Sequence, residues 1–157
     1  MELWGSDPRV LAALDTAGWY SGRRCEIAPW VDSLEAAGFE ISELAQRIWA
    51  EFGGLAIRSL PTRVPSSSLR IAPEDACIDC LDEAHRLRDN LRVGYSPLGM
   101  WSIQFRSYIG DAGDVIAVGP GVRWELGETF SSALEYVVFG DGGGSREVET
   151  SWLLPEY

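Results

Sequence analysis

The sequence contains no lysine, a single histidine and only three cysteines among its 157 residues. Its 13 basic residues are all arginines, and 24 Asp and Glu residues outweigh them, which gives a formal net charge of −11. A protein that binds the phosphate backbone needs a basic surface, so this balance argues against direct nucleic-acid binding and favours a positively charged partner. The odd number of cysteines argues against a disulfide framework and for reduced thiols.

Long apolar runs are missing as well. No stretch approaches the ~20 apolar residues that a membrane-spanning helix needs. The first residues, Met-Glu-Leu-Trp, lack the basic start and the apolar core of a signal peptide. We therefore expect a cytoplasmic protein with no membrane segment, and we favour a monomer.

Helix signals dominate the first third of the chain. Asp7 and Pro8 predict a helix start, because Asp accepts the free amides of a first turn and Pro suits the first helical position. Ser42 is an N-cap signal for a further helix, in which apolar residues recur every four positions up to Phe52. The pattern predicts helices over residues 8–17, 29–37 and 43–52.

Later segments change period. Residues 55–60 and 69–72 are typical of short strands, and residues 74–92 predict the longest helix, with acidic residues early and arginines late. Alternating apolar and polar residues over 101–109 predict a strand, and a Gly/Asp turn leads to further strands over 115–118 and 122–126. Thr129 predicts the cap of a last helix that ends at Gly140.

These elements predict a single α+β domain over residues 1–140, built on a twisted, mostly antiparallel sheet flanked by helices. Residues 141–157 begin as a Gly-rich linker and end in a tail that contains Trp152. We favour packing of Trp152 on the body of the protein over a role as an exposed contact anchor.

Cys77 and Cys80 have the spacing of a redox pair, but the acidic residues around them disfavour a thiolate. Zinc needs four ligands, and only Cys25 and His85 remain to complete a site, at unrelated spacing. No nucleophile motif accompanies His85. We therefore expect no catalytic residue, no metal and no cofactor; a small enzyme that uses Cys77, Cys80 or His85 stays open as a less favoured hypothesis.

The excess negative charge is concentrated towards the C-terminus. Residues 101–157 carry nine acidic residues against three arginines. This distribution favours a sheet face that attracts a basic protein by charge pairing. The solvent-facing positions of the predicted hairpins are the candidate contacts: Gln104, Arg106, Tyr108, Asp111, Asp114, Arg123 and Glu125.

An ordered set of landmarks runs through residues 8–140: Gly18-Trp19, Arg23-Arg24, Trp30, Leu34-x-x-x-Gly38, Phe52-Gly53-Gly54-Leu55, Gly94-Tyr95-x-Pro97-Leu98-Gly99, Leu126-Gly127-x-x-Phe130, Leu134 and Gly140. In this order and spacing the set resembles the SUKH superfamily of bacterial immunity proteins, and its third subgroup in particular.

The resemblance implies a SUKH-like α+β domain that binds and neutralises a cognate toxin of a polymorphic toxin system, often a nuclease or a nucleic-acid deaminase. It carries over no catalytic residues, and its matched glycines and aromatics are landmarks of the fold. The expected partner is therefore a basic toxin domain. A ligand- or peptide-binding regulatory domain of the same fold is the alternative.

Overall fold

The computed structural model describes residues 5, 7–75, 80–140 and 146–153. Within them the chain forms five α-helices and seven strands, with two short 3-10 helices, η1 (Pro73–Asp75) and η2 (Ser151–Leu153). The α-helices are α1 (Pro8–Ala17), α2 (Ala28–Ala36), α3 (Glu43–Phe52), α4 (Cys80–Leu91) and α5 (Phe130–Phe139). The strands are β1 (Ala56–Arg58), β2 (Ser68–Ile71), β3 (Tyr95–Trp101), β4 (Phe105–Gly110), β5 (Val115–Gly119), β6 (Val122–Gly127) and β7 (Glu147–Glu149).

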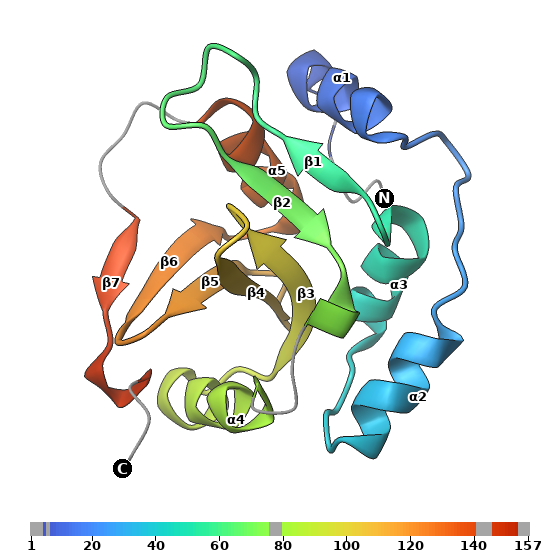
Figure 1. Ribbon diagram of the computed structural model, residues 1–157. Coiled ribbons are helices and arrows are strands. Elements are labelled where there is room, and N and C mark those ends of the chain that lie inside the picture. Colours follow the sequence, from blue (N-terminus) through green and yellow to red (C-terminus); the bar gives the residue numbers. More distant parts are fainter. Residues whose placement is uncertain (1–4, 6, 76–79, 141–145, 154–157) are drawn as a thin grey trace.

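All seven strands belong to one sheet whose spatial order follows the chain, β1 to β7. Every neighbouring pair is antiparallel, so each strand returns beside the one before it. The sheet curls strongly across its width (Figure 1). The predicted single-domain α+β fold with an antiparallel sheet is confirmed.

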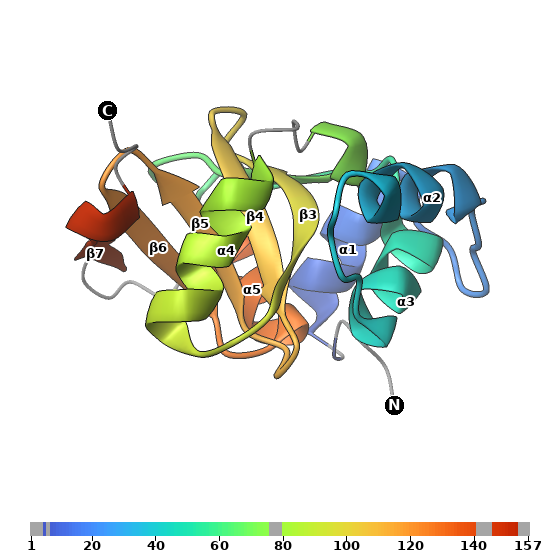
Figure 2. The same ribbon diagram turned by 90° about the horizontal axis from the view of Figure 1, so that it is seen from below.

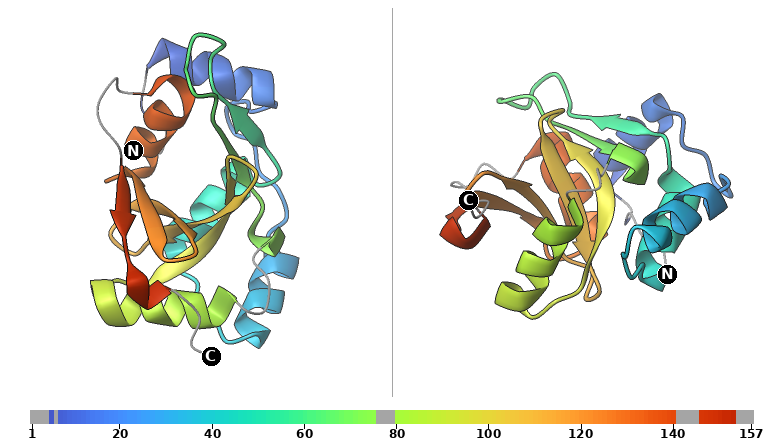
Figure 3. Two further views of the ribbon diagram at one scale, coloured as in Figure 1. Left: turned by 60° about the vertical axis from the view of Figure 1, so that its left-hand side comes forward. Right: turned by 60° about the horizontal axis from the view of Figure 1, so that its bottom comes forward.

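Helices lie on both sides of this curled sheet. Helices α1 and α5 pack together at one side and α4 lies at the other, with the strands between them (Figure 3, left). The core is continuous from the helices into the sheet, and the indole of Trp49 on α3 donates to the carbonyl of Pro97 on β3 at 2.9 Å. This bond holds the helical first third of the chain against the centre of the sheet.

The predicted helix starts are confirmed by their caps. The carboxylate of Asp7 accepts from the amide of Arg9 at 2.8 Å, and the hydroxyl of Ser42 accepts from the amide of Ala45 at 3.1 Å. Helix α5 begins with a reciprocal capping box, in which Thr129 and Ser132 each accept the other's amide hydrogen. These short polar side chains satisfy amides that a helix start otherwise leaves unpaired.

The strand predicted over residues 101–109 is wrong in its bounds. Residues 95–101 form β3, which the sequence analysis missed, and residues 102–104 form the turn into β4. Ser102 and Ile103 adopt positive φ angles of 51° and 72° there. The apolar alternation continues through this turn, and the turn contains no Gly, Asn or Pro to mark it.

The long helix predicted over residues 74–92 is corrected at its start, because residues 73–75 form η1. Helix α4 is described over Cys80–Leu91, and Cys77 lies outside the described residues. Helix α4 keeps the predicted arrangement of charge, with Asp82 and Glu83 in its first turn and Arg88 in its last. No helix in the described part of the chain is long and apolar enough to cross a bilayer.

The C-terminal segment contributes to the sheet and the core. Strand β7 pairs with β6 and lies at the opposite end of the molecule from α2 and α3 (Figure 2). Leu153 on η2 is 2% exposed, and Trp152 packs against the core, as predicted. The predicted Gly-rich linker falls on residues 141–145, outside the described residues.

Candidate functional site

A hollow of about 560 Å³ lies where β4 turns into β5 and where β6 ends. Carboxylates from Asp114, Glu125 and Glu128 line it, together with Arg123 and Arg146. The strand register explains the grouping, because Glu125 lies opposite Ile116 and Gly127 lies opposite Val115. We call this the acidic hollow. It gathers three of the predicted contact residues: Asp114 from the β4–β5 turn, and Arg123 and Glu125 from β6.

Asp114 has one satisfied and one unsatisfied carboxylate oxygen. The phenol of Tyr95 donates to Oδ2 at 2.7 Å, whereas Oδ1 is buried and has no hydrogen-bond partner among the described residues. Burial, and then the bond to Asp114, raise the pKa of Tyr95 well above its ordinary value, so this phenol stays protonated and remains a donor. Asp114 therefore anchors the Tyr95 phenol through Oδ2, while its Oδ1 lies beneath the surface against Gly110.

The acidic hollow is of mixed charge rather than uniformly anionic. Arg123 pairs with Glu125 at 3.0 Å, and the guanidinium of Arg146 donates to the backbone carbonyls of Glu125 and Leu126. Glu125 is exposed even though it is paired. A cationic partner group would therefore meet Asp114, Glu125 and Glu128 beside two arginines that are already engaged.

Asp111 lies close to the acidic hollow but faces another groove. Its side chain is exposed, its amide donates to the carbonyl of Gly94 at 2.9 Å, and it lines a shallow groove together with His85 and Arg88 of α4. The tip of the β4–β5 hairpin thus presents Asp111 and Asp114 in different directions, one towards α4 and one towards β6.

Tyr108 does not face solvent as predicted, and Arg106, whose side chain is 37% exposed, is engaged in an ion pair. Tyr108 is 1% exposed, because α4 covers this side of β4. The phenol of Tyr108 donates to Oε1 of Glu83 on α4 at 2.7 Å, and Arg106 binds both oxygens of the same carboxylate at 2.9 and 2.8 Å. The prediction is wrong here because strand alternation shows which residues share a face, but not which face a helix later covers.

This buried triad has a clear electrostatic character. Burial, and then the negative charge of Glu83, raise the pKa of Tyr108 well above its ordinary value of 10.0. The bond to Glu83 raises the pKa of Arg106, which therefore stays cationic. Glu83, Arg106 and Tyr108 thus fasten α4 to the sheet.

Gln104 is separated from the other predicted contacts. It is exposed in the β3–β4 turn, at the opposite end of β4 from Asp111. The seven predicted contact residues therefore do not form one patch. Asp111, Asp114, Arg123 and Glu125 lie around the β4–β5 turn and β6. Arg106 and Tyr108 bind Glu83 on α4, and Gln104 lies at the opposite end of β4.

A second hollow, which the sequence analysis did not predict, lies near Gln104. Its volume is about 690 Å³, and it lies over the outer face of β1, β2 and β3, where Arg58 and Arg70 are exposed. No described helix passes in front of β1 or β2 (Figure 1). The sequence does indicate a surface of this charge, because no Asp or Glu occurs between Glu51 and Glu74.

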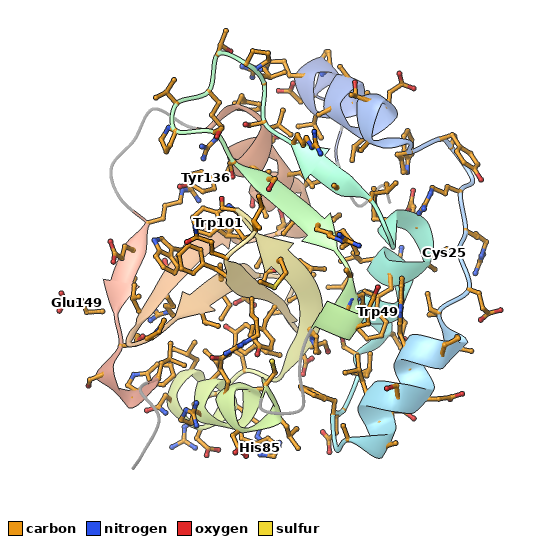
Figure 4. The ribbon with its side chains drawn as sticks, viewed as in Figure 1. Cys25, Trp49, His85, Trp101, Tyr136 and Glu149 are labelled. Carbon is orange, nitrogen blue, oxygen red and sulfur yellow. The ribbon has the colours of Figure 1, made fainter. Side chains whose placement is uncertain are left out.

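Of the residues named in the enzyme and zinc hypotheses, Cys77 lies outside the described residues. Cys80 is fully buried in α4, and the thiol of Cys25 contacts the carbonyl of Trp49 at 3.0 Å. Figure 4 shows His85 on α4 far from Cys25 beside α3. No group of three or more His, Cys, Asp or Glu side chains suited to a metal occurs among the described residues.

Residues 6–140 match the family model described as SUKH-3 immunity protein. The match begins just before α1 and ends at the residue that follows α5, so it covers α1–α5 and β1–β6. No curated protein and no solved structure matches the chain.

Proposed function

The chain belongs to the SUKH-3 immunity protein family, and from that premise we propose that it protects a bacterial cell by binding and neutralising a cognate toxin of a polymorphic toxin system. The match over residues 6–140 carries the proposal. The protein acts in the cytoplasm, as one partner of a protein–protein complex, and it transforms no substrate.

We place the toxin among domains that act on nucleic acid, such as a nuclease or a nucleic-acid deaminase. Such a domain needs a basic surface to hold its polyanionic substrate. A protein of net charge −11 attracts that surface over long range and competes with the substrate for it. Inhibition by occupation of the basic cleft requires no chemistry from the inhibitor.

The acidic hollow and the adjoining tip at Asp111 form the proposed contact for this basic surface. The exposed carboxylates of Glu125 and Glu128 support the assignment, because each can accept hydrogen bonds from an arginine or lysine of the toxin. Arg123 orients Glu125 at 3.0 Å, so the carboxylate is held in place before binding.

The test uses the C-terminal domain of the polypeptide encoded next to the gene for this protein. Titration of that domain with the purified protein should abolish its toxic activity at a 1:1 ratio. The double variant Asp114→Asn/Glu125→Gln should weaken the complex by about tenfold or more. The matched control Asp32→Asn/Glu35→Gln, which makes the same charge change on the exposed side of α2, should weaken it by no more than about twofold.

Activity that persists at excess protein would contradict the proposed function. Equal weakening by the two double variants would preserve the function and remove the acidic hollow from the interface, because only the overall charge would then matter.

A further inference from the structure

Strand β1 is an outer strand of the sheet. The strand order begins with it, so β2 lies at one side of β1 and no described strand lies at the other. Helix α1 lies on the side of β1 that is opposite to β2 (Figure 1). An uncovered edge of this kind presents main-chain donors and acceptors to any extended chain that comes beside it.

The hydrogen bonds towards β2 show which main-chain groups of β1 point outwards. The carbonyl of Leu55 accepts at 3.0 Å and the amide of Ser59 donates at 2.9 Å, both from or to residues in or next to β2. The direction of hydrogen bonding alternates along a strand, so Ile57, midway between them, also faces β2. The amides and carbonyls of Ala56 and Arg58 therefore point away from β2, to the outer edge.

These outward groups are not used within the described part of the chain. No hydrogen bond joins the main-chain amide or carbonyl of Ala56 or Arg58 to another described residue, and both residues are exposed. The two residues are separated by one position, which is the spacing at which alternate residues of an added strand form their hydrogen bonds. The edge of β1 is thus ready to accept a further strand.

A groove of about 630 Å³ lies along this outer edge, and we call it the edge groove. Ala12, Ala13, Thr16 and Ala17 of α1 form one wall, and Ala56 and Arg58 line the other. Because every α1 side chain in this wall is small, the helix leaves room for a main chain beside β1. A groove between a helix and an edge strand suits a peptide that adds to the sheet and places alternate side chains against the helix.

The charge of the edge groove is positive. Among its lining residues Arg58 is the charged one, and neither Asp nor Glu occurs there. Residues 52–73, which form β1, the loop that follows and β2, contain no Asp or Glu either. A carboxylate on the incoming segment is therefore attracted to Arg58, whereas a lysine or arginine at the same place is repelled.

We propose that an extended, acidic segment of the partner toxin adds to the seven-stranded sheet beside β1, in the edge groove. This inference rests on the proposed function and adds a contact that the acidic hollow does not supply. The main chain of the segment pairs with Ala56 and Arg58. Its side chains on the α1 side pack against Ala12 and Thr16, and the residue opposite Arg58 carries a carboxylate that points to the same side of the sheet as the guanidinium.

A second copy of this chain is the less suitable occupant of the edge. Pairing of two β1 strands brings together two molecules that each carry a net charge of −11. It also places each Arg58 beside a segment, residues 52–73, that has no carboxylate to offer. An acidic segment of a basic toxin meets neither obstacle.

Amide hydrogen exchange, followed residue by residue by NMR, tests the added strand directly. In the isolated protein the amides of Ala56 and Arg58 should exchange rapidly, and in the complex with the toxin domain their exchange should slow by about tenfold or more. The amide of Ile57 faces β2 and is the internal control, with slow exchange in both states. The measurement uses the wild-type chain, so it does not depend on the folding of a variant.

A substitution on α1 tests whether the edge groove itself is occupied. Ala12 is exposed, and Ala12→Trp fills the groove without a change of charge. It should raise Kd by about tenfold or more in calorimetric titration with the toxin domain. The matched control Ala28→Trp, at an exposed position of α2, should change Kd by no more than about twofold. Thermal melting shows whether each variant is folded.

The acidic character of the segment has its own test. Arg58→Ala should raise Kd by about threefold or more, because the carboxylate of the segment loses its partner. Arg24→Ala removes the same charge from an exposed position between α1 and α2 and should change Kd by no more than about twofold. Equal effects of the two variants would contradict the pairing with Arg58.

The outcomes separate the two proposals. A wild-type protein that binds no toxin defeats the proposed function. Toxin binding that leaves the exchange of Ala56 and Arg58 unchanged, or that Ala12→Trp and Ala28→Trp weaken equally, defeats the added strand and leaves the proposed function standing. If the two amides are protected in the isolated protein and their protection rises with protein concentration, a second copy occupies the edge and the inference is overturned.

Discussion

At the scale of single residues, the most consequential group is Glu83. Its carboxylate is buried and receives three hydrogen bonds, two from Arg106 and one from Tyr108. Glu83→Gln removes the negative charge that pairs with Arg106 and replaces one acceptor oxygen by an NH₂ donor, so at least one of the three hydrogen bonds is lost. We expect a loss of about 2–3 kcal/mol in the free energy of unfolding, measured by urea denaturation. Glu35→Gln, an equal charge change at an exposed site on α2, should cost less than about 0.5 kcal/mol.

The buried tyrosines make the protein sensitive to alkali. Because folding raises the pKa of Tyr108 above its ordinary 10.0, the unfolded chain loses this proton first as pH rises. The stabilising contribution is complete below pH 10 and is lost above it, by up to about 1.4 kcal/mol per pH unit for each such tyrosine. Tyr108→Phe should flatten the decline measured above pH 10; an unchanged slope would contradict the burial of this phenol.

At the scale of elements, the C-terminal segment tests how far the folded unit extends. Strand β7 pairs with β6, and Leu153 on η2 is buried beneath it, near α4. Leu153→Ala should lower the free energy of unfolding by about 2–4 kcal/mol, because it leaves a cavity in the core. Val64→Ala, a truncation at a residue that is 88% exposed, should have almost no effect. Equal stability of the two variants would mean that the segment does not contribute to the fold.

Local chemistry made most of these elements predictable. The caps at Asp7, Ser42 and Thr129 are short-range signals, and each lies where the sequence placed it. The β3–β4 turn could not be located, because Ile103 continues the apolar alternation and adopts a backbone conformation that its side chain disfavours.

The candidate contacts depended on longer-range information. Alternation correctly placed Arg106 and Tyr108 on one face of β4, but the helix that covers this face lies more than 20 residues earlier in the chain. Glu83 is only a weak sign, in the sequence, of the contact between α4 and β4. It is an acidic residue among positions that are buried, Cys80, Ala84 and Leu87. The segment without acidic residues between Glu51 and Glu74 is visible in the sequence, but only the strand register shows that Arg58 and Arg70 lie on the same face of the sheet.

At the scale of the whole molecule, charge is polarised across the sheet. Arginines dominate the β1–β2 edge, and carboxylates gather towards β6 and β7, within a net charge of −11. Long-range attraction of a basic toxin follows the net charge, so the association rate constant should fall at least about tenfold between low salt and 0.5 M salt in stopped-flow measurements. An association rate constant that does not change with salt would contradict long-range electrostatic attraction between the protein and the toxin.

Neutralisation of a toxin is the central claim, and survival of living cells measures it most directly. Cells that express the toxin domain encoded beside this gene should die when the protein is absent and grow when it is co-expressed. Killing that continues at full expression of the folded protein would contradict the claim.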